Sequence, residues 1–176
     1  MSKPAYTEFL EKYGAVTQAH SRRTLFDHLW GTYWLLKTWR CEETVCCAGL
    51  FHSIYGTNAF KHISLGLEHR NKLRALIGQE AENLVYLFHS TSRPWGWIDA
   101  IHHRGTTSRL SGQFLAMDAR TIAQLIEIDC ANLIEQGGGL HFLSVIAEEL
   151  IEAQFSIADA AMFAILDASA SFDVNR

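Results

Sequence analysis

The sequence has no excess of basic residues and no basic cluster. It contains 15 Lys and Arg against 19 Asp and Glu, for a formal net charge of -4, and its arginines are scattered over several segments. Proteins that bind nucleic acid through the phosphate backbone need a concentrated positive patch. The composition therefore gives no electrostatic reason to expect nucleic acid, and no nucleic-acid partner is predicted.

Long apolar runs are also missing. The longest, such as residues 158–166, are interrupted by acidic residues and are too short to span a bilayer, which takes about 20 apolar residues. The N-terminal segment has no apolar core of the kind that a signal peptide carries. We therefore expect neither a membrane segment nor export.

Regularly spaced cysteine pairs are absent. The four cysteines are Cys41, Cys46, Cys47 and Cys130, and none of their spacings is CxxC. Disulfide frameworks and zinc sites usually show repeated spacings, so we expect reduced thiols in a cytoplasmic protein. The sequence also has no glycine-rich phosphate loop, GxSxG or HExxH motif. Cys46 and Cys47 have no evident base beside them, so we interpret them as buried thiols.

What the sequence does have is a helical hydrophobic pattern along nearly its whole length. Apolar residues make up 48%, enough at this length to close one core, and they recur at helical spacing without strand-like alternation. The predicted fold is all-α, a single helical domain over residues 1–176. Ser21 and Asp118 are the expected N-caps of two helices. Helices are expected over about 5–13, 22–39, 41–52, 65–77, 80–90, 119–136, 140–155 and 157–170, and a long loop with short helical pieces over 92–117.

Two histidines fall on consecutive helices that face the core. His28 shares an apolar face with Leu25 and Leu29, and His52 ends the next helix. A single histidine in such a setting is most often a hydrogen-bonded core residue. Two of them can meet inside a bundle, and neutral imidazole is a good ligand for Zn, Fe or Mn. The pattern is thus consistent with a metal site or with two core histidines.

An acidic residue falls in the inward stripe of the helix over 119–136. Asp129 shares this stripe with Ile126 and Leu133, where an ionised carboxylate is unfavourable unless it is paired or bound to metal. Asp129 is therefore either a third metal ligand or the partner of an arginine or a helix end. Glu127 points elsewhere and is expected to be solvated.

The expected loop over 92–117 combines cations with aromatic residues. Arg93, Trp95 and Trp97 lie close together in it, a combination that suits an anionic or aromatic ligand. The alternative is that the tryptophans pin an irregular loop onto the bundle. His20 is expected near the helix that carries His28. His62, His69 and His89 are expected at the surface.

These segments resemble a known family. The stretch HLWGTYWLLKTWRCEETVCCAGLFHS, residues 28–53, resembles the HD-domain superfamily, in particular the HD domain of the stringent-response nucleotide hydrolases. RALIGQEAENLVYLF and IEIDCANLIEQ resemble later helices of that domain, so that the likeness covers about residues 20–136. The string AGLFHSIYGT is also similar to a smaller HD-like group in which serine follows the histidine.

The resemblance implies an HD-like helical bundle and a set of ligands. By position it implies His28, His52 and Asp129 as metal ligands, and it places Ser53 where the family has an aspartate. In binuclear members that aspartate bridges two metal ions, and a neutral hydroxyl cannot replace its charge. The resemblance therefore implies a single divalent ion (Fe, Mn or Zn) or none.

Three functions remain open at this point. The first is a small-molecule enzyme of hydrolase or oxygenase type. The second is a degenerate HD domain that binds a small ligand without turnover, and the third is an interaction domain that forms a homodimer through the helices over 140–170, which otherwise pack on the rest of the domain. For the enzyme, the expected catalytic residues are His28, His52 and Tyr55, and the expected substrate-binding residues are Arg93, Trp95, Trp97, His20 and Ser53.

Overall fold

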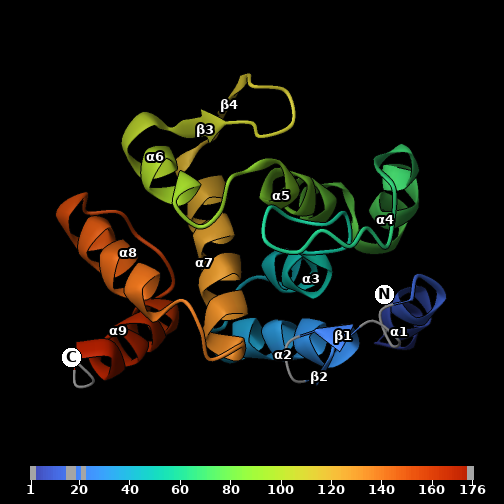
Figure 1. Ribbon diagram of the computed structural model, residues 1–176, viewed down its shortest axis with the longest axis horizontal. Coiled ribbons are helices and arrows are strands. Elements are labelled where there is room, and N and C mark those ends of the chain that lie inside the picture. Colours follow the sequence, from blue (N-terminus) through green and yellow to red (C-terminus); the bar gives the residue numbers. More distant parts are fainter. Residues whose placement is uncertain (1–2, 15–18, 21–22, 174–176) are drawn as a thin grey trace.

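The chain folds mainly into helices, as its periodicity predicts (Figure 1). The computed structural model describes residues 3–14, 19–20 and 23–173. In this part of the chain no helix is both long enough and apolar enough to cross a membrane. The helices are α1 (Lys3–Lys12), α2 (Leu25–Thr38), α3 (Glu43–Phe51), η1 (Leu67–His69), α4 (Arg70–Ile77), α5 (Gln79–Ser90), α6 (Gly96–His103), α7 (Ala119–Glu135), α8 (Leu140–Glu152) and α9 (Asp159–Asp173).

Two short hairpins interrupt the helices, although the sequence predicted no strand. β1 (Ala19–His20) pairs with β2 (Arg23–Thr24), and β3 (Gly105–Thr107) pairs with β4 (Phe114–Ala116), both antiparallel. Strands of two or three residues are too short to display a period of two. In the segment over 92–117, α6 is a short helical piece of the kind that was expected, and the second hairpin was not expected.

The start of α2 is set by a capping box. Thr24 is the N-cap, its hydroxyl accepts the N–H of Asp27 at 3.1 Å, and the Asp27 carboxylate bonds back to Thr24. Ser21, the expected cap, lies outside the described residues. Asp27 is therefore a structural residue that fixes the start of the helix carrying His28.

Helix α7 lies at the centre of the fold (Figure 1). It packs against α2, α3 and α5 on one side and against α9 on the other, and α6 also contacts it. Its N-cap is Asp118, as predicted, and the Asp118 carboxylate accepts the N–H of Thr121 at 2.7 Å. The two opposite faces of α7 border two different cavities.

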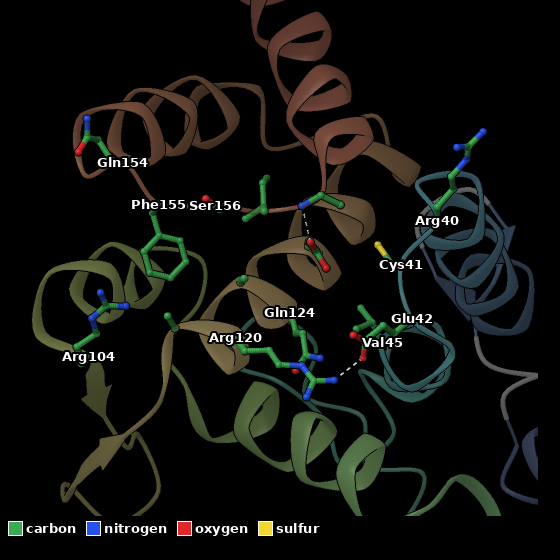
Figure 2. Close-up of a pocket in the computed structure, with 15 residues that line it drawn as sticks. Arg40, Cys41, Glu42, Val45, Arg104, Arg120, Gln124, Gln154, Phe155 and Ser156 are labelled. Atoms are coloured by element: carbon green, nitrogen blue, oxygen red, sulfur yellow. Dashed lines mark hydrogen bonds and ion pairs between the residues drawn. The ribbon is translucent and has the colours of Figure 1, made fainter.

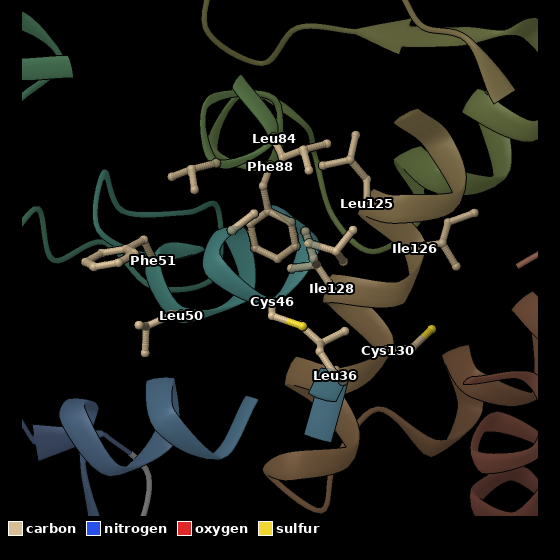
Figure 3. Packing of buried hydrophobic residues seen from close by; sticks show 14 of the residues in the cluster. Leu36, Cys46, Leu50, Phe51, Leu84, Phe88, Leu125, Ile126, Ile128 and Cys130 are labelled. Atoms are coloured by element: carbon tan, nitrogen blue, oxygen red, sulfur yellow. The ribbon is translucent and has the colours of Figure 1, made fainter. Parts of the chain in front are cut away.

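The core is a layer of apolar side chains between α3, α5 and α7 (Figure 3). Phe88 of α5 lies between Cys46 of α3 and Leu125 of α7, all of them buried. Burying a large apolar side chain contributes about 1.5–3 kcal/mol, so this layer holds α3 and α5 against the central helix. Ala161 and Ile165 of α9 are also fully buried, which shows that the C-terminal helices pack on the rest of the domain.

The four cysteines are free. Burial raises the pKa of the Cys46 thiol to about 12 and that of the Cys47 thiol to about 11. The thiolate is the nucleophilic form of cysteine, so these two residues have the character of buried thiols, as their position on a core helix indicated.

Candidate functional site

The structure brings His28 and His52 together inside the bundle. Their Nε2 atoms lie 3.4 Å apart and their rings are nearly perpendicular, at 89°. His28 lies in the second turn of α2 and His52 is the C-cap of α3, and both side chains are buried. The packing of α2 on α3 therefore places the Nε2 atoms of the two histidines next to each other.

Each of the two rings is held by its other nitrogen. His52 donates its Nδ1–H to the carbonyl oxygen of Gly49 at 2.7 Å, and His28 donates its Nδ1–H to the carboxylate of Glu135 at the end of α7. With its Nδ1–H donated in this way, a neutral His52 presents the lone pair of its Nε2. The Nε2 of His28 also lies 3.1 Å from the Oδ1 of Asn132.

Asp129 lies close to the histidines, but its carboxylate is engaged elsewhere. Oδ1 accepts hydrogen bonds from the guanidinium of Arg93 and from the amide of Asn132, the latter at 3.1 Å, and Oδ2 accepts from the indole N–H of Trp97 at 2.7 Å. Asp129 is fully buried. Of the two interpretations of this residue, the structure shows the bond to an arginine.

These donors do not fit the single divalent ion that the family resemblance implies. Zinc sites use at least three protein ligands, and in the described part of the chain no three His, Cys, Asp or Glu side chains gather into such a group. The chemistry of the residues explains this result. Ser53 is neutral, and Arg93 supplies Asp129 with the positive charge that a metal ion would otherwise bring.

A cavity of about 210 Å³ lies beside this cluster. Two buried polar atoms in its wall, the Oγ of Ser53 and the Nε of Arg93, have no hydrogen-bond partner among the described residues. Buried polar groups are hydrogen-bonded in the great majority of cases, so two such atoms on residues of one cavity wall are unusual. The wall is formed by His52, Ser53, Thr57, Ala59, Phe60, Arg93, Pro94, Asp129, Asn132, Leu133 and Gln136.

Tyr55, predicted to be catalytic, belongs to a different cluster. Its hydroxyl donates to Glu82 at 3.0 Å, and the same carboxylate forms ion pairs with Arg70 and Arg74. Burial, together with the negative charge of Glu82, raises the pKa of Tyr55 above its ordinary range. Tyr55 is not among the residues that form the wall of the His52 cavity, and its catalytic role stays a prediction.

The two tryptophans that were expected to bind substrate do not form part of the cavity wall. Trp97 is fully buried and holds Asp129 through its indole. Trp95 is 49% exposed and stands edge-on to Phe142 of α8. These contacts match the alternative in which the tryptophans pin this segment onto the bundle. The side chain of His20 lies outside what the structure describes.

Two residues expected at the surface are buried. Glu127 accepts the backbone N–H of Ala158 at 2.8 Å, and burial raises the pKa of its carboxyl. His89 donates its Nδ1–H to the carbonyl oxygen of Gly56 at 2.7 Å, and burial lowers its pKa. Each partner is a backbone group far away in sequence, which local patterns do not reveal.

Sequence reasoning missed three polar residues of this region. Asn132 and Gln136 border the cavity, and Glu135 holds His28. A signal was available for the first two, because positions three and seven residues after Asp129 lie on the same helical face. Glu135 had no such signal, since only the packing of α2 against the end of α7 brings it to His28.

A family model matches the N-terminal part of the chain. Residues 9–93 match a domain of unknown function (DUF6817). This segment extends from α1 to the turn after α5 and contains His28, His52, Ser53 and Arg93, whereas α7 lies beyond it. No curated protein and no solved structure matches the chain. The matched segment thus contributes one side of the cavity, and α7 contributes the other.

Proposed function

We propose that this protein binds a small polar molecule in the cavity beside His52, and that it does so without a resident metal ion. The observation that carries the proposal is the pair of buried, unpartnered atoms, Ser53 Oγ and Arg93 Nε, which belong to the wall of one cavity. An unpaired buried donor or acceptor is unfavourable by about 1–3 kcal/mol. A ligand that accepts from Arg93 and bonds to Ser53 would relieve both.

The cavity limits the size and chemistry of that ligand. Its volume of about 210 Å³ is below the roughly 300–1,000 Å³ of pockets that hold drug-sized molecules. Thr57, Asn132 and Gln136 add a hydroxyl and two amides to the wall. These features favour a compact molecule with several polar groups over a whole nucleotide.

Acid–base catalysis on the bound molecule is a second candidate function. It is favoured by the series of contacts Glu135–His28–His52. A carboxylate on Nδ1 orients an imidazole and stabilises its protonated form. His52 borders the cavity, so its Nε2 would exchange the proton with the ligand, and His28, held by Glu135, would stabilise the protonated His52 as a positioning residue behind it.

Three finer expectations belong to the same proposal. The all-α fold and the meeting of His28 with His52 support an HD-like architecture. The free cysteines support a cytoplasmic location. Phe163 and Leu166 of α9 remain exposed, which supports a homodimer through the C-terminal helices, and a monomer in sedimentation at micromolar concentration would contradict it.

Ligand occupancy tests the main proposal. The protein is purified from cells and denatured, and the released small molecules are identified by mass spectrometry. We expect a compact polar compound from the wild type and its loss from Ser53→Leu, which fills the cavity with an apolar side chain. Ser111→Leu, at an exposed position, is the matched control. Equal yields of the compound from all three proteins would refute binding in this cavity.

Elemental analysis of the same preparations tests whether the site is metal-free. We expect no stoichiometric metal in the wild type. Stoichiometric Fe, Mn or Zn that disappears in both His28→Ala and His52→Ala would instead establish a metal site and overturn this half of the proposal.

A further inference from the structure

A second and larger cavity lies on the other face of α7 (Figure 2). It has a volume of about 520 Å³ and is bordered by the turn between α2 and α3, the end of α6, α7 itself and the segment between α8 and α9. This volume is within the range of pockets that hold drug-sized ligands. The function proposed above makes no use of it.

Three residues in an unfavourable backbone conformation border this cavity. Arg40, Arg104 and Gln154 have φ of 60°, 57° and 49°, and in the described part of the chain they are all the non-glycine residues with positive φ. All three belong to the wall of the one cavity. Each follows a helix, at a position where glycine adopts this conformation with less strain.

One of these strained residues places its side chain along the wall. Figure 2 shows Arg104 beside Phe155, whereas Arg40 and Gln154 point away from the middle of the space. Strained residues that cluster around one site indicate a functional requirement, since folding alone would favour relief of the strain. At residue 104 the strained backbone places a guanidinium in the wall, where glycine would place no donor.

The charges in the wall favour an anion. It contains three arginines, Arg40, Arg104 and Arg120, against two glutamates. Glu42 is already paired with Arg120, at 2.6 Å, and Glu127 accepts the N–H of Ala158. The wall therefore retains an excess of positive charge.

The remainder of the wall is apolar. The guanidinium of Arg104 lies 5.4 Å from the ring centroid of Phe155, and Figure 2 shows this pair on one side of the space and Arg120 with Gln124 on another. A molecule with an apolar body could lie against these surfaces while its acid group meets a guanidinium. The apolar surface is completed by Val45, Ala119, Ala123, Ile157 and Ala158.

We propose that this second cavity is a binding site for an organic anion with an apolar body. Arg104 binds the acid group, and Phe155 and the aliphatic wall contact the body. The site is independent of the His52 cavity, because the two are lined by different residues on different faces of α7.

The test uses anilinonaphthalene sulfonate, a fluorescent probe with one acid group and an aromatic body. We expect saturable binding to the full chain, weakened about tenfold or more in Arg104→Gly because a charge-assisted bond is lost. The same substitution is expected to raise Tm by up to about 3 °C, because glycine adopts the backbone conformation of residue 104 without strain. A purely structural role for Arg104 would not combine weaker binding with a higher Tm.

Two comparisons complete the test. Gln154→Gly should raise Tm in the same way without weakening probe binding, because it relieves backbone strain but removes no donor from the cavity. Lys72→Ala, which removes an exposed cation on α4, should show neither effect. N-phenylnaphthylamine, which has a similar body without the acid, should bind about tenfold more weakly than the sulfonate. Equal binding of the two probes, unchanged binding in Arg104→Gly, or no saturable binding to the wild type would each overturn the proposal.

Discussion

Helix α7 buries two carboxylates, Asp129 and Glu127, two residues apart and in different surroundings. Asp129 accepts bonds from a guanidinium, an indole and an amide. Glu127 accepts a backbone N–H and interacts with the thiol of Cys41, and neither of these groups carries a positive charge. Burial consequently raises the pKa of Glu127. The difference shows that the chemistry of a buried carboxylate depends on whether a cation accompanies it.

Removing Arg93, the cation beside Asp129, should give the largest effect on stability. In Arg93→Met, Asp129 stays buried without a compensating charge, and we expect the free energy of unfolding to fall by about 3–5 kcal/mol. Urea denaturation measures the loss. Arg93→Met/Asp129→Asn should recover part of it, because the uncompensated charge is removed as well. If the free energy of unfolding of Arg93→Met falls by less than about 1 kcal/mol, the Arg93–Asp129 bond contributes no more than an exposed ion pair does.

Glu82 extends the comparison to a buried carboxylate with two arginines. Burial opposes ionisation, but hydrogen bonds from Arg70, Arg74 and Tyr55 outweigh it and lower the pKa of Glu82. The stability from this group is therefore present above the ordinary pKa of Glu and is lost as the pH falls through the lowered value. We expect Glu82→Gln to be less stable than wild type by about 2 kcal/mol at pH 7.

The measurement for Glu82 is urea denaturation of both proteins as a function of pH. The gap between wild type and Glu82→Gln should shrink as the medium becomes strongly acidic, because the wild-type carboxylate then loses its charge. A gap that stays constant over the whole acid range would show that the charge of Glu82 does not contribute to stability.

Glu127→Gln should show the opposite dependence on pH. Because the pKa of Glu127 is raised in the folded protein, the wild type loses stability as the pH rises from the ordinary pKa of Glu to the raised value. Glutamine keeps an acceptor for the N–H of Ala158 and cannot ionise. Its stability relative to wild type, measured by thermal unfolding, should therefore improve from pH 4 to pH 8. A relative stability that declines over this range would contradict the assignment.

Tyr55→Phe should give the smallest effect. It removes one hydrogen bond to Glu82, and the expected loss of stability is about 0.5–1.5 kcal/mol. Binding of the small polar molecule in the His52 cavity should not change, because Tyr55 belongs to the Glu82 cluster. A ligand that dissociates from Tyr55→Phe, but not from a variant of equal stability elsewhere, would restore Tyr55 to the site.

The fold and part of the site follow from local patterns in the sequence. Helical periodicity predicts the helices, and it also places His28 on the inner face of α2 and Asp129 on the inner face of α7. Periodicity identifies the face of a side chain but not its partner. Arg93 for Asp129, Glu135 for His28 and the N–H of Ala158 for Glu127 all come from distant segments. These pairings depend on tertiary packing, which a single sequence does not encode as a readable pattern.

The Arg93–Asp129 bond crosses the end of the segment that matches the family model. Arg93 is the last matched residue, and Asp129 lies 36 positions further along the chain, outside the match. The Glu135–His28 bond crosses the same boundary. We therefore expect positions 93 and 129, and likewise 28 and 135, to vary together among related sequences. A fragment that ends at residue 93 would separate Arg93 and His28 from their partners. A different C-terminal half would leave Arg93 and His28 without these partners, unless both residues changed as well.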